Sequence, residues 1–320
     1  MLARVECFCY TCFGAYHNFT VMFAELLSEG GLSLERLQSF CLVAQAGGVT
    51  KAARGDPGKQ SLYSRQVKEL EEFFGTELIR RKGRGIVLTE AGARLNTIAC
   101  ECSAALNDFK SVCKGLPVEV VIGAGESIID WVLMPRLAEV RRRLPNVRMK
   151  FLNLPTTEIV RRLADGVIDF GVVRKDSVSR PLRGASLGMM SYSLFVPQGL
   201  RTTGSGASVL EELALATLEG EGTFRKELAT MAEKHRLRLN IEVECASFPL
   251  VARAVATGRV AGILPSAAAV ELGPEAAREM TIGALEGLKR EMWLAWSPRA
   301  LRIRTALEGI KQVFSQAFRV

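Results

Sequence analysis

Residues 60–74 read QSLYSRQVKELEEFF, and this stretch decides the first part of the fold. Its apolar side chains recur at spacings of four, three and four residues, the period of one buried helical stripe: Tyr63, Val67, Leu70 and Phe74. The opposite side carries amide, hydroxyl and cationic groups and no carboxylate: Gln60, Ser61, Ser64, Arg65 and Lys68. Such a face suits the DNA major groove, whose base edges present hydrogen-bond donors and acceptors. The alternative interpretation is an ordinary solvated helix face.

Two further helices are predicted before this stretch. Apolar residues recur at helical spacing over residues 34–44, which predicts a first amphipathic helix. A short second helix is expected next, with Thr50 as its N-cap. Residues 55–58 end it, because Pro57 disfavours the α region at the residue before it. The third helix is then expected to begin at Gln60, which completes a helix-turn-helix.

A basic hairpin is predicted directly after the third helix. Residues 80–85 read RRKGRG, with four cations and two glycines, and residues 86–88 read as a return strand. A basic β-wing of this kind can lie along DNA phosphates, which supply affinity that is independent of sequence. The alternative is a charged, solvated surface.

A long helix is expected after the wing, from Thr89 to about Cys113. Apolar side chains recur along it every three to four residues and form a seam: Leu95, Ile98, Cys102, Ala105 or Leu106, and Phe109. A seam of this kind suits helix–helix dimerisation, and packing of the helix against its own domain is the alternative.

Strands and helices alternate after Val118, which predicts βαβ units and a parallel sheet. The expected fold class is therefore α/β overall, with an N-terminal winged helix-turn-helix, a long linker helix and a C-terminal two-lobed α/β domain. The expected boundaries are an extension of doubtful structure at 1–31, the winged domain at 32–90, the linker helix at 91–115 and the two-lobed domain at 116–320. Within the last, lobe one is expected at about 118–196 and 284–320, and lobe two at about 197–283.

Composition narrows the class of protein. Hydrophobic residues make up 48% of the chain and charged residues 24%, which is typical of globular proteins. The formal net charge of +8 permits an anionic partner such as nucleic acid. No apolar stretch is long enough for a membrane span, and the eight cysteines lack the density of a secreted disulfide scaffold, so we expect a cytoplasmic protein without a membrane partner.

Metal binding and catalysis are not expected. Cys7, Cys9, Cys12 and His17 are possible ligands for a soft metal, but their spacing matches no common zinc module. An unstructured extension, or a start codon nearer Met22, explains this segment better. The chain has two histidines and lacks the G-x-S-x-G, H-E-x-x-H and P-loop motifs, so we expect neither an enzyme nor a cofactor.

The sequence resembles the LysR-type transcriptional regulators over residues 32–320. Residues 48–54 and 60–71 match the helix-turn-helix of that family, and residues 78–92 match its wing and the start of its linker helix. Residues 163–172, LADGVIDFGV, look like the pattern that closes the third strand of its sensing domain. The turn before the third helix departs from the family pattern at four positions and is more polar: Asp56, Gly58, Lys59 and Ser61.

The resemblance implies residues for two kinds of site. The DNA-binding residues would be Thr50, Lys51, Lys59, Gln60, Ser61, Ser64, Arg65, Lys68, Arg81, Lys82 and Arg84. The second module would be similar to periplasmic binding proteins and would hold a small-molecule effector between its lobes, at Ser127, Thr156, Thr223, Ser247 and Phe248. The resemblance also favours a dimer of dimers over a simple dimer.

We therefore expect a regulator that binds double-stranded DNA and responds to an unidentified small molecule. A solute-binding protein without a DNA-binding role is the alternative, but it leaves the basic helix-turn-helix unexplained. An architectural DNA-binding protein leaves the two-lobed domain without a role.

Overall fold

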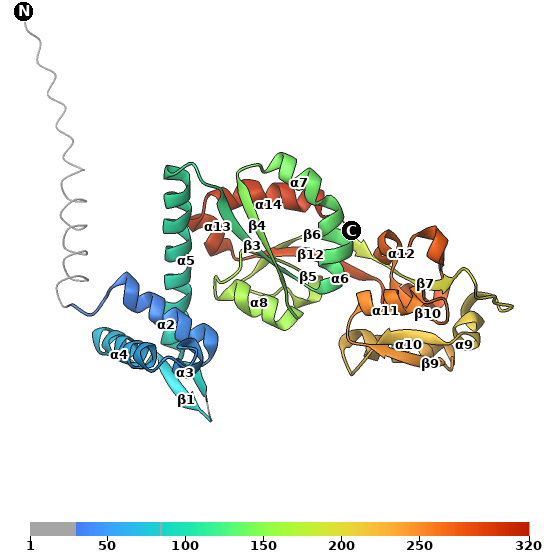
Figure 1. The fold of residues 1–320 in the computed structure, drawn as a ribbon, viewed down its shortest axis with the longest axis horizontal. Helices are drawn as coiled ribbons and strands as arrows, with labels where there is room; N and C mark the ends of the chain where they lie inside the picture. The colour runs from blue at the N-terminus through green and yellow to red at the C-terminus, as the bar shows by residue number, and fades with distance from the viewer. Residues whose placement is uncertain (1–29, 84, 320) are drawn as a thin grey trace, which may run out of the picture. The chain divides into compact units, whose positions relative to one another are not determined.

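A computed structural model of the chain describes residues 30–83 and 85–319 (Figure 1). The described residues form two compact units, which divide between Cys100 and Glu101. None of the helices in the described ranges is both long enough and apolar enough to cross a membrane.

The first unit contains three helices followed by a two-stranded hairpin. The helices are α2 (Leu34–Ala46), α3 (Val49–Ala52) and α4 (Pro57–Phe74), and the strands are β1 (Ile79–Lys82) and β2 (Gly85–Leu88). Helix α5 (Glu90–Cys113) starts in this unit and ends in the second. The hairpin is antiparallel, with Ile79 opposite Leu88 and Lys82 opposite Gly85.

A small apolar core holds this unit together. Side chains of α2, α4 and the start of the hairpin form it: Phe40, Val43, Val67, Leu70 and Leu78. Helix α5 begins tightly against the same region, because a Cβ on Gly92 would lie 1.9 Å from the carbonyl oxygen of Leu78. No other residue fits at this position without moving the backbone, so glycine fixes where α5 leaves the hairpin.

Helix α4 begins three residues earlier than the sequence indicated. Its first residue is Pro57, not Gln60, and its N-cap is Asp56. The Asp56 carboxylate accepts hydrogen bonds from the backbone N–H groups of Gly58, at 2.9 Å, and Lys59, at 3.2 Å. Proline is compatible with the first helical turn, where backbone N–H groups have no helical partner. The polar turn therefore starts the helix instead of separating it from α3.

Helix α3 also differs from the expectation at its start. Gly48 is its N-cap and makes no side-chain cap bond, whereas Thr50 lies inside the helix. The hydroxyl of Thr50 is thereby left to interact with α4 instead of capping α3.

The second unit contains two five-stranded sheets, each the centre of one lobe. In the first lobe the strand order is β4-β3-β5-β12-β6, and Figure 1 shows helices on both faces of this sheet. The strands are β3 (Val118–Ala124), β4 (Val147–Asn153), β5 (Phe170–Arg174), β6 (Arg183–Met190) and β12 (Arg290–Trp296). The helices are α6 (Glu126–Ile128), α7 (Leu137–Arg143), α8 (Thr156–Ala164), α13 (Pro298–Ile303) and α14 (Ala306–Ala317), with the short turns η1 (Ile129–Leu133), η2 (Met134–Arg136) and η3 (Lys175–Ser177).

The second lobe has the strand order β11-β7-β10-β8-β9. Its strands are β7 (Tyr192–Pro197), β8 (Leu215–Leu218), β9 (Ile241–Cys245), β10 (Ala261–Pro265) and β11 (Ala277–Met280). Its helices are α9 (Val209–Glu212), α10 (Thr223–His235), α11 (Phe248–Ala256) and α12 (Ala269–Ala276), with the short turns η4 (Gly206–Ser208), η5 (Ser266–Ala268) and η6 (Gly283–Leu288).

The chain crosses between the lobes at different residues from those expected. Residues 194–197 were expected to close lobe one, but they belong to β7, which pairs antiparallel with β10 and β11 in the second sheet. The return was expected at residue 284, but η6 packs against α10 and β7, and the first sheet resumes only at Arg290. The crossings therefore lie at Ser191 and Lys289. An apolar strand such as β7 is buried in either sheet, so its composition does not reveal which sheet it joins.

The helix expected over residues 128–143 is interrupted. It consists of the short α6, a π-helical turn in η1, a 3-10 turn in η2 and the regular α7. Pro135 lies in η2 and has no backbone N–H to donate, which accounts for the change in helical hydrogen bonding there.

Candidate functional site

The polar face of α4 is exposed and continuous. All five side chains predicted to form it are exposed, and together with Pro57 they line a shallow hollow: Gln60, Ser61, Ser64, Arg65 and Lys68. The buried side of the helix is formed by Gln66, Val67 and Leu70. The helix therefore presents amide, hydroxyl and cationic groups outward while its apolar stripe fixes its orientation.

One hydrogen bond fixes this face to the preceding helix. The Nε2 of Gln60 donates to the hydroxyl of Thr50 at 3.1 Å. The bond restricts the Gln60 side chain and leaves its amide oxygen available as an acceptor. An amide held in this way is suited to reading a base edge.

The cations of α4 make weak ion pairs with neighbouring carboxylates. Lys59 lies 3.7 Å from Asp56, and the i,i+4 pairs Arg65–Glu69 and Lys68–Glu72 each span 3.5 Å. Such exposed pairs contribute little to stability and exchange readily for other anions. The cations are therefore available for a phosphate or a base.

The wing is held to α4 by an acidic residue. The Oε1 of Glu71 accepts hydrogen bonds from the backbone N–H groups of Leu78, at 2.8 Å, and Ile79, at 3.2 Å. Arg81 and Lys82 follow on β1 and are exposed. Arg84, the third predicted wing cation, lies outside the described residues.

The remaining predicted DNA-binding residues also lie on the surface, and one cation was missed. Thr50, Lys51 and Lys59 are exposed, at the α3–α4 end of the unit. Arg54 is exposed in the same turn and has a positive φ of 51°. Sequence reasoning treated this turn only as a helix break, although the order Arg-Gly before a polar turn was visible.

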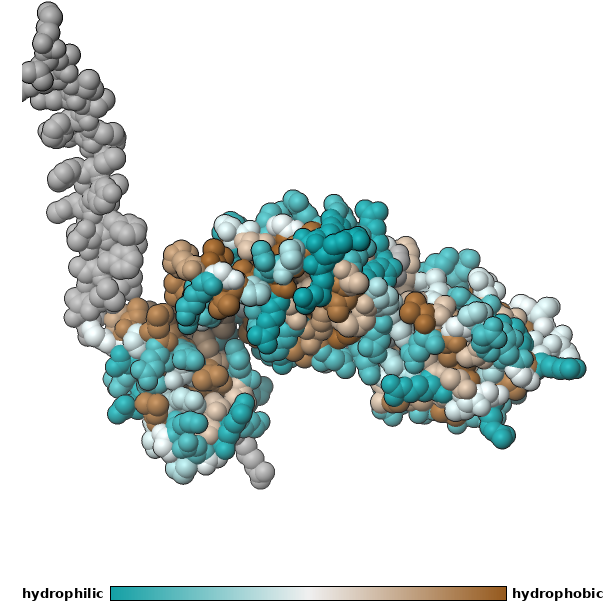
Figure 2. Space-filling model, turned by 45° about the horizontal axis from the view of Figure 1, so that its top comes forward, coloured by the Kyte–Doolittle hydropathy of each residue, from teal (hydrophilic) through white to brown (hydrophobic). Residues whose placement is uncertain are grey.

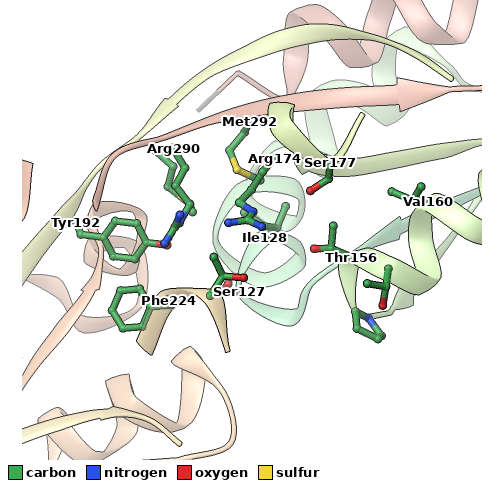
Figure 3. Close-up of a pocket in the computed structure, with 14 residues that line it drawn as sticks. Ser127, Ile128, Thr156, Val160, Arg174, Ser177, Tyr192, Phe224, Arg290 and Met292 are labelled. Carbon is green, nitrogen blue, oxygen red and sulfur yellow. The ribbon is translucent and has the colours of Figure 1, made fainter. Parts of the chain in front are cut away.

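The second unit contains a cavity of about 670 Å³ between its lobes (Figure 3). Six of its lining residues are apolar: Ile128, Pro155, Val160, Met190, Phe224 and Met292. The others are polar: Ser127, Thr156, Thr157, Arg174, Ser177, Tyr192, Thr223 and Arg290. The lining includes two arginines and no carboxylate, so it favours an anionic ligand.

The cavity lies beside both crossings of the chain. Met190 and Tyr192 flank the first crossing, and Arg290 follows the second. A ligand held here contacts the segments that connect the two sheets. A ligand bound there can therefore change the relative orientation of the two lobes.

The two arginines are held by a small polar network. Arg290 donates from Nη2 to Glu227 of α10, and its Nε lies 3.4 Å from the hydroxyl oxygen of Tyr192. Arg174 lies 3.8 Å from Glu227 and 3.5 Å from Asp176. Burial raises the pKa of Tyr192, so its hydroxyl stays protonated and keeps a proton to donate.

Three of the five predicted effector residues lie at this cavity. Ser127, Thr156 and Thr223 line it, whereas Ser247 and Phe248 are not among the lining residues. The Phe248 ring instead packs against Phe224, with ring centroids 4.9 Å apart, and supports the cavity wall. Ser247 is the N-cap residue of α11.

Sequence reasoning missed the charged and aromatic lining. Arg174 ends β5, and the carboxyl end of a strand in an open α/β sheet is a place where ligands bind, so its position offered a signal. Tyr192 and Arg290 offered none, because their proximity depends on where the chain crosses between the lobes.

The predicted seam of α5 divides into a packed and an exposed part. Leu95 is partly buried against the core of the winged unit. Ile98, Cys102 and Phe109 are exposed, and so are Leu106 and Val112 on the same helix. Figure 2 shows apolar surface where the C-terminal half of α5 lies in Figure 1.

The described ranges contain no group of three or more residues that could hold a metal ion. Cys7, Cys9, Cys12 and His17 lie outside the described residues.

Two family models match the chain. Residues 34–93 match the bacterial regulatory helix-turn-helix protein of the lysR family, and residues 115–315 match the LysR substrate binding domain. An uncharacterized HTH-type transcriptional regulator, YfeR of Shigella flexneri, is 31% identical over 145 residues, 44% of this chain and 47% of that protein. The nitrogen assimilation regulatory protein nac of Klebsiella aerogenes is 28% identical over 251 residues, 75% of this chain and 81% of that protein.

The chain spans about half the length of the curated relatives it matches first: the match covers 47% of YfeR and 47% of a probable nitrogen assimilation transcriptional activator of Synechococcus elongatus. Solved structures resemble the fold over more of the chain. A full-length OxyR variant from Pseudomonas aeruginosa has a TM-score of 0.64 at 18% identity and covers 89% of this chain and 95% of its own. Full-length LysG from Corynebacterium glutamicum with bound effector arginine has a TM-score of 0.57 at 15% identity, and covers 88% and 98%.

Full-length CbnR in complex with its target DNA has a TM-score of 0.55 at 19% identity and covers 88% of this chain and all of its own. At these identities the likeness shows the fold alone. The family assignment comes from the models, of which the substrate-binding one alone covers residues 115–315, more than half of the chain. The chain belongs to the LysR-type transcriptional regulator family.

Proposed function

We propose that the protein is a sequence-specific DNA-binding transcriptional regulator whose DNA binding or transcriptional output is modulated by a small molecule in the interlobe cavity. The observation that carries this proposal is the exposed face of α4, on which the Gln60 amide is held by Thr50 at 3.1 Å. A solvated helix face has no need of an oriented amide between hydroxyl and cationic neighbours.

The residues divide by the contacts they suit. Gln60, Ser61, Ser64 and Arg65 suit base edges, because they project from one face of a single rigid helix. The other exposed groups suit phosphates and sugars, where precise orientation matters less: Thr50, Lys51, Lys59, Lys68, Arg81, Lys82 and, from the sequence, Arg84. We add Arg54 to this second group, because it is exposed in the turn between α3 and α4.

The cavity supplies the sensing role. Ser127, Thr156 and Thr223 line it, with the two arginines. LysG with bound effector arginine, which has a similar fold, and CbnR with its target DNA support a protein that engages both a small molecule and DNA. We retain no effector role for Ser247 and assign Phe248 to support of the wall.

The same proposal covers assembly, compartment and class. Helix α5 exposes five apolar side chains: Ile98, Cys102, Leu106, Phe109 and Val112. We propose that a second copy of the chain covers them, in a dimer or a tetramer. We propose a cytoplasmic location, because that is where the proposed DNA partner would be met. The named relatives are regulators, and we propose no catalytic step.

The test is recovery of DNA from genomic fragments by the full chain, followed by sequencing. We expect enrichment of a shared motif, and loss of that enrichment in a Gln60→Ala, Arg65→Ala double variant. Arg302→Met, a change at an exposed cation of α13, is the matched control and should leave enrichment unchanged. Failure of the wild-type chain to retain duplex DNA would favour the alternative, a solute-binding protein without a DNA-binding role.

A further inference from the structure

Two arginines of the first lobe share one carboxylate of the second. Arg174 is the last residue of β5 and Arg290 the first of β12, whereas Glu227 lies on α10. Arg290 donates to Glu227 Oε2, and the Arg174 Nη1 lies 3.8 Å from Glu227 Oε1. Glu227 therefore links the lobes at the edge of the cavity.

The positive charge at the cavity is only partly compensated. Arg174 and Arg290 both line it, and its lining contains no carboxylate. Glu227 contacts the arginines from a neighbouring hollow that they also line. Asp176 approaches Arg174 but is mostly exposed, so solvent weakens that pair. One carboxylate facing two guanidinium groups leaves room for one more anionic group.

The other lining residues indicate the chemistry of the rest of the ligand, to which the anionic group is attached. In Figure 3 the side chains of Arg174 and Arg290 converge beside Ser127, with Tyr192 and Phe224 on one side. Helices α8 and α10 begin at the cavity with Thr156 and Thr223, and neither has a side-chain cap, so their first N–H groups add positive potential. The apolar remainder, which includes Ile128, Val160, Met190, Phe224 and Met292, suits a hydrocarbon body.

We propose that the effector is a small carboxylate with an apolar body, and that its carboxylate replaces Glu227 on Arg174 and Arg290. A planar carboxylate has two oxygens to offer the guanidinium groups, and the Glu227 carboxylate now presents one oxygen to each arginine. Glu227 has a side chain 36% exposed and can turn to solvent when displaced, whereas Arg290 is 10% exposed and cannot. Displacement breaks the ion pairs between the lobes next to the crossings at Ser191 and Lys289. This inference rests on the proposed sensing role of the cavity.

The binding test uses the full chain and calorimetric titration. The probes are phenylacetate and isovalerate, their neutral amides phenylacetamide and isovaleramide, and inorganic phosphate. We expect at least one carboxylate to bind, and its amide to bind roughly tenfold or more weakly, because the amide forfeits a charged hydrogen bond. Equal binding of the amide, binding of phosphate alone, or no carboxylate binding in the millimolar range would overturn the inference.

Variants test the displacement step. Arg290→Met and Arg174→Met should each weaken binding of the same carboxylate roughly 10- to 100-fold. Glu227→Gln should tighten it severalfold, because the competing anion is gone, while Glu233→Gln on the exposed side of α10 should leave it unchanged. Unchanged or weaker binding in Glu227→Gln refutes displacement. If Arg290→Met fails to fold, Arg290→Lys, which retains the charge, replaces it in the binding measurement.

DNA recovery with the same preparations separates the two proposals. If the wild-type chain enriches a DNA motif but binds no carboxylate, the effector class is wrong and the regulator remains. If it binds the carboxylate but retains no DNA, the proposed regulatory function fails while the carboxylate site stands.

Discussion

Arg304 donates two hydrogen bonds to the carboxylate of Asp108, from Nε at 2.6 Å and from Nη2 at 2.9 Å. Asp108 lies in the C-terminal half of α5, and Arg304 directly follows α13 of the first lobe. The same guanidinium contacts Asp169 and donates to the backbone carbonyl of Glu119 at 2.8 Å. A second pair, Arg299–Glu101 at 2.7 Å, lies near the same helix. The C-terminal half of α5, which belongs to the second unit, is therefore anchored by charge to the first lobe.

Removal of the Arg304 guanidinium should destabilise the second unit. Arg304→Met leaves two carboxylates, Asp108 and Asp169, largely buried without their partner. We expect the free energy of unfolding to fall by about 3 kcal/mol, since an uncompensated buried charge is costly. Arg302→Met, two residues away and exposed, should change it by less than about 0.5 kcal/mol. Chemical denaturation of both variants measures the difference, and equal stability would mean that the network adds nothing.

Asp169 should give the domain a pH-dependent stability. Burial raises its pKa from 3.8 to about 6, against the opposing effect of Arg304. Because the folded state then binds the proton more tightly than the unfolded chain, the wild-type free energy of unfolding should fall relative to Asp169→Asn as pH rises from about 4 to about 6. Above that range the difference should be constant. A difference that is flat across the whole range, or that grows in favour of the wild type, would contradict the raised pKa.

The winged unit was predictable because its signals are local. The apolar stripe of α4 through Val67 and Leu70 is a property of one helix, and the polar face follows from it. The start of α4 was missed because Asp56 caps a helix with proline in its first turn, and the sequence alone permits the same residues to form a break. A cap and a break differ in backbone conformation, not in composition.

The cavity was only partly predictable, for a physical reason. Ser127, Thr156 and Thr223 could be placed from strand–helix turns, which follow the chain. Arg290 meets Arg174 and Glu227 because β12 returns to the first sheet after the whole second lobe. Pairing between strands so distant in sequence has no local signal. Asp169, in the motif-like segment 163–172, likewise shows its role only through Arg304.

Base reading should depend on the outer face of α4. Gln60→Ala or Arg65→Ala should each weaken specific DNA binding by about 1–3 kcal/mol and relax sequence preference. Thr50→Val should reproduce part of the Gln60 effect, because it removes the hydroxyl that holds the amide. Competition binding with matched and scrambled duplexes measures both quantities. Unchanged affinity and preference in the two α4 variants would place the reading face elsewhere.

Assembly should depend on the exposed half of the α5 seam. Phe109 is 69% exposed, so Phe109→Asp should break the oligomer without disturbing the chain's own core. Leu95→Asp is expected to do something different, because Leu95 packs against the core of the winged unit and its replacement should lower stability. Sedimentation separates the outcomes. A Phe109→Asp variant that is folded but dissociated supports the exposed α5 side chains as the oligomer interface. A wild-type chain that is monomeric at micromolar concentration would exclude it.

The wing should contribute affinity without sequence preference. Arg81 is exposed on β1, two residues after Ile79, whose backbone N–H is held by Glu71. Its long side chain can reach phosphates but lacks the rigid frame that base reading requires. Arg81→Ala should therefore weaken binding to cognate and random duplexes about equally, and the slope of log affinity against log salt should shrink by about one. Arg302→Ala, at an exposed cation of α13 outside the winged unit, is the control and should leave affinity and salt slope unchanged. A loss confined to the cognate duplex, with the salt slope intact, would show that the wing reads DNA shape in the minor groove.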